Sequence, residues 1–81
     1  MNNNSISVTV KFFATLRQYG PDKEVLLIPE NSKVKLLFDK YSIPKEERRA
    51  IILVNGRPHK DLNTILKDGD LISIFPPIGG G

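Results

Sequence analysis

The amino-acid sequence predicts one α+β domain in which a single main helix crosses one face of a mixed β-sheet. Three observations support this prediction. Residues 5–13 alternate between apolar and polar side chains, residues 34–41 carry apolar side chains at helical spacing, and Asn55-Gly56 is a strong hairpin signal. The chain has 81 residues, which suffice for one hydrophobic core and are too few for two. We expect the domain to span residues 1–75 and an extended, flexible C-terminal tail to occupy residues 76–81.

Residues 5–13 are expected to form a half-buried strand, because their side chains alternate with the period of two that a strand imposes. The apolar set of this strand is Ile6, Val8, Val10 and Phe12. Phe13 breaks the alternation, since parity places its ring on the otherwise polar face. Phe13 is therefore a candidate exposed aromatic side chain.

A second strand is expected after a turn at residues 20–22, which read Gly-Pro-Asp. Glycine tolerates positive φ and proline presets its own φ, so this triplet is typical of a chain reversal. Residues 23–28 then form a run of high β propensity that ends before Pro29. The two strands are expected to pair as a hairpin with a long loop.

The main helix is expected to follow Ser32, whose hydroxyl suits an N-cap. Its apolar stripe has the i, i+3, i+4, i+7 spacing of one helical face and consists of Val34, Leu37, Phe38 and Tyr41. Pro44 restricts the residue before it and so ends a helix of about ten residues. Residues 45–49 are expected to add a surface turn.

A second hairpin is expected around Asn55-Gly56, because both residues accept the left-handed conformation that a type I′ turn requires. The strand before the turn is the apolar, β-branched run at residues 50–54, and residues 57–60 form the short return strand. A further turn reads Asp-Gly-Asp at residues 68–70.

The last strand is expected over residues 71–75, with Phe75 on the face opposite Ile72 and Ile74. The predicted order is strand, strand, helix, strand, short strand, strand. The economical way to bury the helical stripe and one face of each strand is to lay the helix across the sheet. This arrangement is the β-grasp, or ubiquitin-like, roll.

Composition and charge disfavour several classes of function. The net charge of +3 comes from 12 Lys and Arg residues against 9 Asp and Glu residues, and both signs are interspersed, as in residues 45–49. The aromatic residues do not alternate with a basic run, as they would on a surface that stacks nucleic-acid bases. Without cysteine there is no disulfide, thiolate metal site or cysteine nucleophile. We expect no nucleic-acid partner and no metal site.

No apolar run approaches the roughly 20 residues that a membrane-spanning helix needs. Residues 1–4 are polar and contain no basic segment that leads into an apolar stretch, so neither a signal peptide nor a transit peptide is expected. The sequence therefore favours the cytoplasm and no membrane partner.

The C-terminal segment carries the reactive group that points to a function. Pro76 and Pro77 cannot donate hydrogen bonds to a sheet, and they favour an extended exit from the last strand. After Ile78, the glycines at 79–81 carry no side chains, so the backbone can enter a narrow channel. The carboxylate of Gly81 is then the reactive group, and it needs activation, as in a mixed anhydride with AMP, before a nucleophile can attack it.

A glycine-rich terminus that is only a disordered linker is the alternative interpretation of this tail. The stiff Phe-Pro-Pro segment at residues 75–77 argues against it, because a flexible linker rarely begins with a rigid segment fixed to a terminal strand. We therefore favour a functional tail.

Four segments of the chain stand out together. They are Phe12-Phe13-Ala14-Thr15-Leu16-Arg17, Val54-Asn55, Leu66-Lys67-Asp68-Gly69-Asp70 and Ile74-Phe75-Pro76-Pro77-Ile78-Gly79-Gly80-Gly81. In order and spacing they resemble the ubiquitin-like sulfur carriers, and most closely the small subunit of molybdopterin synthase. The thiamine sulfur carriers share the fold and the diglycine, but they lack the Phe-Ala-x-Leu-Arg segment and are less similar.

The resemblance implies a carrier that is not an enzyme on its own. A partner similar to ubiquitin-activating, or E1, enzymes would use ATP and Mg²⁺ to adenylate Gly81, and a sulfur donor would convert the adenylate into a thiocarboxylate. The charged carrier would dock on the large subunit of molybdopterin synthase, in a heterotetramer, and pass sulfur to a pterin precursor. In this cycle Gly80 and Gly79 give clearance, and the reach and direction of the tail are set by Pro76, Pro77 and Ile78.

Partner binding is expected at Phe13 and Phe75, because both fall opposite the main apolar sets of their strands and large exposed aromatic side chains often mark interfaces. The resemblance also implies an exposed apolar patch near these positions. Arg17 and Arg57 are candidate rim contacts. His59, the single histidine, has no recognisable partners for a metal site in the sequence.

Two further classes of function remain open. One is a ubiquitin-like protein modifier that is conjugated to lysines of other proteins through Gly81. The other is a β-grasp interaction domain with an inert tail. The resemblance implies a more acidic protein than this chain, whose net charge is +3. The difference bears on which pathway the carrier serves and not on the chemistry of the tail.

Overall fold

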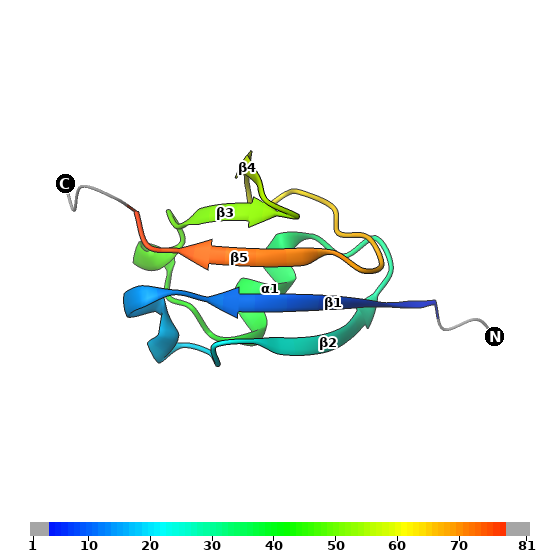
Figure 1. Ribbon diagram of the computed structural model, residues 1–81, viewed down its shortest axis with the longest axis horizontal. Helices are drawn as coiled ribbons and strands as arrows, with labels where there is room; N and C mark the ends of the chain where they lie inside the picture. The colour runs from blue at the N-terminus through cyan, green and yellow to red at the C-terminus, as the bar shows by residue number, and fades with distance from the viewer. Residues whose placement is uncertain (1–3, 78–81) are drawn as a thin grey trace.

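A five-stranded sheet organises the chain in the computed structural model, which describes residues 4–77 except for the side chain of His59 (Figure 1). Its strands are β1 (Ser5–Phe12), β2 (Glu24–Pro29), β3 (Ile51–Val54), β4 (Arg57–Lys60) and β5 (Leu71–Phe75). The helices are α1 (Val34–Lys40) and the 3₁₀ helices η1 (Ala14–Gln18) and η2 (Lys45–Glu47).

The sheet is mixed, and its strand order is β2-β1-β5-β3-β4. β1 and β5 are parallel neighbours at its centre, with Val10 opposite Ile72, while the other pairs are antiparallel. The two expected hairpins, β1–β2 and β3–β4, therefore form, and β5 joins them. Together with α1 this topology confirms the predicted β-grasp roll.

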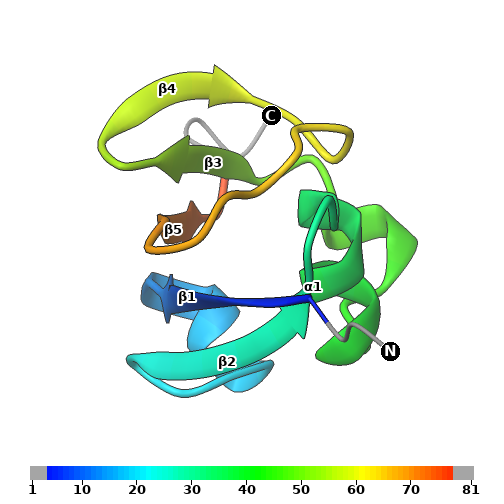
Figure 2. The same cartoon turned by 90° about the vertical axis from the view of Figure 1, so that its right-hand side faces the viewer.

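The core lies between α1 and one face of the sheet, whose strands curve around the helix (Figure 2). The alternation predicted for β1 is confirmed, because every second side chain from Ile6 to Phe12 is buried. The apolar stripe of α1 is buried at Val34, Leu37 and Phe38. Loop residues complete the core, and the largest fully buried side chains outside the sheet and α1 are Leu16, Ile43 and Leu66.

α1 is shorter than predicted, and Ser32 is not its N-cap. The N-cap is Lys33, which makes no capping hydrogen bond with its side chain, and the Ser32 hydroxyl donates to the Pro29 carbonyl instead. The first amides of α1 bond to a distant loop: Val34 N donates to Thr64 O and Lys35 N to Leu62 O, both at 2.9 Å. Backbone carbonyls thus satisfy the donors that a capping side chain would otherwise serve.

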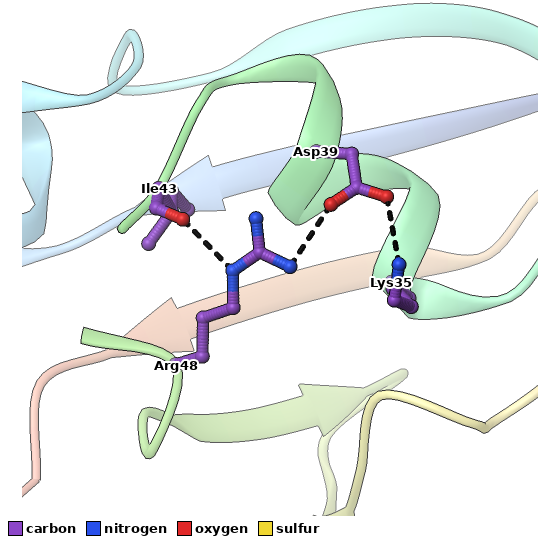
Figure 3. Close-up of polar contacts among 4 residues, drawn as sticks. All are labelled: Lys35, Asp39, Ile43 and Arg48. Carbon is purple, nitrogen blue, oxygen red and sulfur yellow. Dashed lines mark hydrogen bonds and ion pairs between the residues drawn. The ribbon is translucent and has the colours of Figure 1, made fainter. Parts of the chain in front are cut away.

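An ion-pair cluster fastens α1 to the segment that leads into β3 (Figure 3). The Asp39 carboxylate accepts hydrogen bonds from Lys35 Nζ at 3.1 Å and from Arg48 Nη1 at 2.9 Å. Arg48 Nε also donates to the Ile43 carbonyl at 2.8 Å. The hydrogen bonds from Lys35 and then from Arg48 lower the pKa of the Asp39 carboxyl group below its ordinary value.

Tyr41 closes the other end of α1 against β1 and β2. Its ring meets the buried ring of Phe12 edge to face, with centroids 4.8 Å apart, and its hydroxyl donates to Glu24 Oε1. Burial, and then the Glu24 carboxylate, raise the pKa of the Tyr41 hydroxyl well above its ordinary value.

The predicted turn at Asn55-Gly56 is confirmed, since both residues have positive φ, 54° and 79°. The predicted turn at residues 68–70 is also present, and Gly69 in it has a φ of 86°. The helix η1 was not predicted. It holds the buried side chain of Leu16, a single apolar anchor that gives no periodic pattern in the sequence. Within residues 4–77, no helix has the length and apolar character that crossing a membrane requires.

Candidate functional site

The face of the sheet that α1 does not cover, here called the open face, carries the candidate site. The register across the sheet identifies its members, because residues paired opposite each other share a face. Thr9 pairs with Leu71, Lys11 with Ser73, and Ile51 with Phe75. The apolar side chains of the open face on the three inner strands are half-buried and comprise Phe75, Leu71, Ile51 and Leu53.

Phe13 joins these side chains by stacking on Phe75. The two rings are nearly parallel, with an angle of 13° between their planes and centroids 4.2 Å apart. The Phe13 amide donates to the Ile74 carbonyl at 3.1 Å, which extends the β1–β5 ladder one residue beyond β1. This bond keeps Phe13 next to β5, where its ring stacks on that of Phe75. Both rings remain half-buried. The parity prediction that placed Phe13 and Phe75 away from the core is therefore confirmed, and the two rings form one aromatic surface.

A positive charge borders this aromatic surface. Lys11 Nζ lies 5.5 Å from the centroid of the Phe13 ring, a cation–π distance. Lys11 and Phe13 are on the same face because they are two residues apart along β1 and its extension. A partner that covers the stacked rings would meet an ammonium group at their edge, where an acidic side chain of the partner would be favourable.

The tail leaves the sheet directly from this surface. Phe75 ends β5, Pro76 after it is half-buried, and Pro77 is exposed. Neither proline extends the strand, in agreement with their lack of a donor. The predictions for Ile78, Gly79, Gly80 and Gly81 lie outside the described residues.

The two arginines predicted as rim contacts lie at opposite ends of the sheet. Arg17 is exposed near the end of η1, which follows Phe13 directly, so it lies at the same end of the sheet as the aromatic stack. Arg57 is exposed at the start of β4 and pairs with Val54, whereas Phe75 pairs with Ile51 at the other end of β3. The structure therefore brings Arg17, and not Arg57, to the end of the sheet that carries Phe13 and Phe75.

Two exposed apolar side chains of the open face were missed by the sequence analysis. Val25 and Leu27 on β2 are 62% and 76% exposed, and they pair with Thr9 and Ser7. Parity did not reveal them because β2 is apolar on both faces, so the sequence does not tell which set is buried. No group of three or more potential metal-ligating side chains occurs among the described residues.

Comparison with known proteins identifies relatives of the chain. The model of the ThiS family matches residues 10–81. No curated protein matches the chain. The putative molybdopterin converting factor, subunit 1, of Pyrococcus furiosus is 33% identical over 91% of this chain and 100% of its own, with a TM-score of 0.72.

Two further solved structures share 33% identity with the chain. Small archaeal modifier protein 1 of Methanosarcina acetivorans covers 96% of this chain and 99% of its own, with a TM-score of 0.67. A complex of subunits 1 and 2 of the molybdopterin-converting factor of Helicobacter pylori contains a chain that covers 94% of this one and 100% of its own, with a TM-score of 0.55. With a family match over most of its length and a β-grasp fold, the chain belongs to the ThiS family of ubiquitin-like sulfur carriers.

Proposed function

We propose that this carrier serves molybdopterin synthesis as the small subunit of molybdopterin synthase, with Gly81 as the residue that bears the sulfur. The observation that carries the proposal is the position of the Phe13–Phe75 stack. It is a half-buried aromatic surface at the residue where the tail begins. Because the tail begins directly after Phe75, a partner that binds this surface next to its own active site would hold the start of the tail close to that site.

The relatives support the choice of partner. A 33% identical chain carries the name of molybdopterin converting factor subunit 1, and another is found in complex with subunit 2 of that factor. We infer a large-subunit partner for this chain, docked on the open face, with Lys11 and Arg17 as cations at the edge of the contact.

The proposed chemistry occurs at the Gly81 carboxylate. An E1-like partner uses ATP and Mg²⁺ to form the acyl adenylate, with release of diphosphate. A sulfur nucleophile such as hydrosulfide then attacks the acyl carbon, the bond to AMP breaks, and a thiocarboxylate, AMP and a proton remain. Activation is necessary because the free carboxylate is anionic and lacks a good leaving group. The chain itself supplies clearance and position, through Gly79 and Gly80 and through Pro76 and Pro77.

The experiment is a reconstitution with an activating enzyme, ATP, Mg²⁺ and hydrosulfide, followed by intact-mass measurement. We expect a mass gain equal to the difference between sulfur and oxygen. Adding the large subunit and a pterin precursor should then remove the added sulfur and form the dithiolene. A variant that lacks Gly80 and Gly81 is the control and should show no gain. An unchanged mass for the full chain in an active mixture would contradict carrier chemistry at Gly81.

A protein modifier is the second candidate, because small archaeal modifier protein 1 is equally identical to the chain. On that interpretation Gly81 would form an isopeptide bond with a lysine of a target protein. Peptide mass spectrometry of trypsin-digested cell extracts separates the two functions. Only the modifier would leave its C-terminal peptide, residues 68–81, on target lysines, because Lys67 is the last lysine or arginine of the chain. A charged carrier that transfers no sulfur to the pterin precursor would favour the modifier or a thiamine-type carrier.

A further inference from the structure

A pocket of about 350 Å³ lies at the end of the sheet remote from the aromatic stack. It is formed by the β3–β4 hairpin and by the loop that leads into β5. The buried side chain of Val54 and the half-exposed side chain of Ile65 give it an apolar part. Its volume is within the range of pockets that hold small molecules.

Three cations line this pocket: Arg57, Lys60 and Lys67. Arg57 and Lys67 are exposed and Lys60 is half-buried. In the part of the chain that the structure describes, the ion pairs join Lys35 and Arg48 to Asp39, and none includes a pocket cation. Positive charges gathered around a concave surface raise the local concentration of anions.

The one acidic group in the pocket wall is already engaged. Asp70 Oδ1 accepts from the Asn55 side-chain amide at 2.8 Å, and Asp70 Oδ2 accepts from the Lys67 backbone amide at 2.8 Å. These bonds tie the carboxylate to the hairpin turn and to its own loop. Asp70 therefore organises the pocket, and the three cations outnumber it.

We propose that this pocket binds an oligophosphate anion, free or as part of a nucleotide. An arginine fork and two ammonium groups match a chain of phosphate oxygens, which carries several negative charges within one small volume. A single phosphate would leave much of the pocket empty. Among the side chains that the structure describes, which do not include that of His59, none that lines the pocket is aromatic, so stacking on a nucleobase is not part of the proposal. The site is independent of the function proposed for Gly81.

The test is a titration of the full chain with inorganic triphosphate and, separately, with ATP, without Mg²⁺ and at low salt, followed by backbone NMR. We expect saturable shifts confined to the amides of Asn55, Arg57 and residues 64–70. The affinity should fall as salt is added. ATP that binds no more tightly than triphosphate would indicate recognition of phosphates alone, and tighter binding of ATP would indicate a contribution from the nucleoside. Both results support the site.

The decisive variant is Arg57→Gln, Lys60→Gln, Lys67→Gln, which we expect to bind triphosphate about tenfold more weakly or worse. Its matched control is Lys40→Gln, Lys45→Gln, Arg49→Gln. The control also replaces one arginine and two lysines, so both variants reduce the net charge from +3 to 0, and the three control residues are exposed near the far end of α1. Amide spectra of both variants establish that the fold is intact. Non-saturable shifts, or equal weakening in the two variants, would overturn the proposal, because binding would then depend only on net charge.

Discussion

The ring of Phe12 occupies the space that a side chain at position 20 would need. A methyl group added at Gly20 would lie 2.7 Å from Cδ1 and 2.9 Å from Cζ of that ring. Phe12 is fully buried and packs edge to face on Tyr41, so its ring has little room to move. We predict that Gly20→Ala lowers the free energy of unfolding by about 1–3 kcal/mol, as measured by urea denaturation.

The smaller side chain in Phe12→Leu provides the control for this overpacking. The double variant, Gly20→Ala with Phe12→Leu, should lose less free energy of unfolding than the sum of the two single losses, because leucine leaves room for the methyl group. Strictly additive losses would show that the cost at position 20 arises in the backbone and not from contact with the ring.

Asn55 fastens the β3–β4 turn to β5. Its side-chain amide nitrogen donates to Asp70 Oδ1 at 2.8 Å, and its side-chain oxygen accepts from the backbone amide of Leu71 at 2.9 Å. Its φ is 54°, in the left-handed region. We predict that Asn55→Gly, which keeps that backbone conformation and loses both hydrogen bonds, costs about 1–2 kcal/mol in denaturation experiments. Asn55→Ala should cost about 1 kcal/mol more, since alanine also resists positive φ. Equal losses would contradict the contribution of the backbone.

The aromatic stack is predicted to dominate binding of the large subunit. Phe13→Ala should weaken that binding by roughly 30-fold or more, because aromatic anchors near the centre of an interface commonly contribute 2 kcal/mol or more. Leu36→Ala is the control, since Leu36 is also an exposed apolar side chain but lies on α1, on the other side of the sheet from the open face. Calorimetric titration should find that Leu36→Ala binds like the parent chain. If both variants bind equally weakly, the loss is not specific to the stack and the prediction fails.

Acid should weaken the connection between α1 and η2 through Asp39. The pKa of this carboxyl group is below its ordinary value in the folded chain, because Lys35 and Arg48 donate hydrogen bonds to it. Its contribution to stability is therefore present above the unfolded-state pKa and is lost as the pH falls through the lower, folded-state pKa. We predict that Asp39→Asn reduces the acid sensitivity of the free energy of unfolding below about pH 4. Denaturation curves at a series of pH values test this, and parallel pH profiles for parent and variant would refute it.

Local patterns predicted the elements whose stability depends on their own side chains. The alternation from Ile6 to Phe12 identified β1, and the same parity placed Phe13 and Phe75 together on the open face. The prediction of the N-terminus of α1 was wrong because the first amides of the helix bond to the carbonyls of Leu62 and Thr64. These residues lie far along the chain, and no local pattern encodes such contacts. The basic pocket escaped notice for a similar reason, since Arg57, Lys60 and Lys67 meet only when the hairpin and the following loop pack together.

The parallel pairing of β1 and β5 has a consequence for the synthesis of the chain. The β1–β2 hairpin and the β3–β4 hairpin bond to each other only through β5, the last of the five strands to be made. A chain growing on a ribosome therefore cannot complete the sheet until residues 71–75 have emerged. Closure across so long a stretch of sequence is slow compared with forming either hairpin. The Phe13–Phe75 stack is therefore formed only in chains whose sheet is complete.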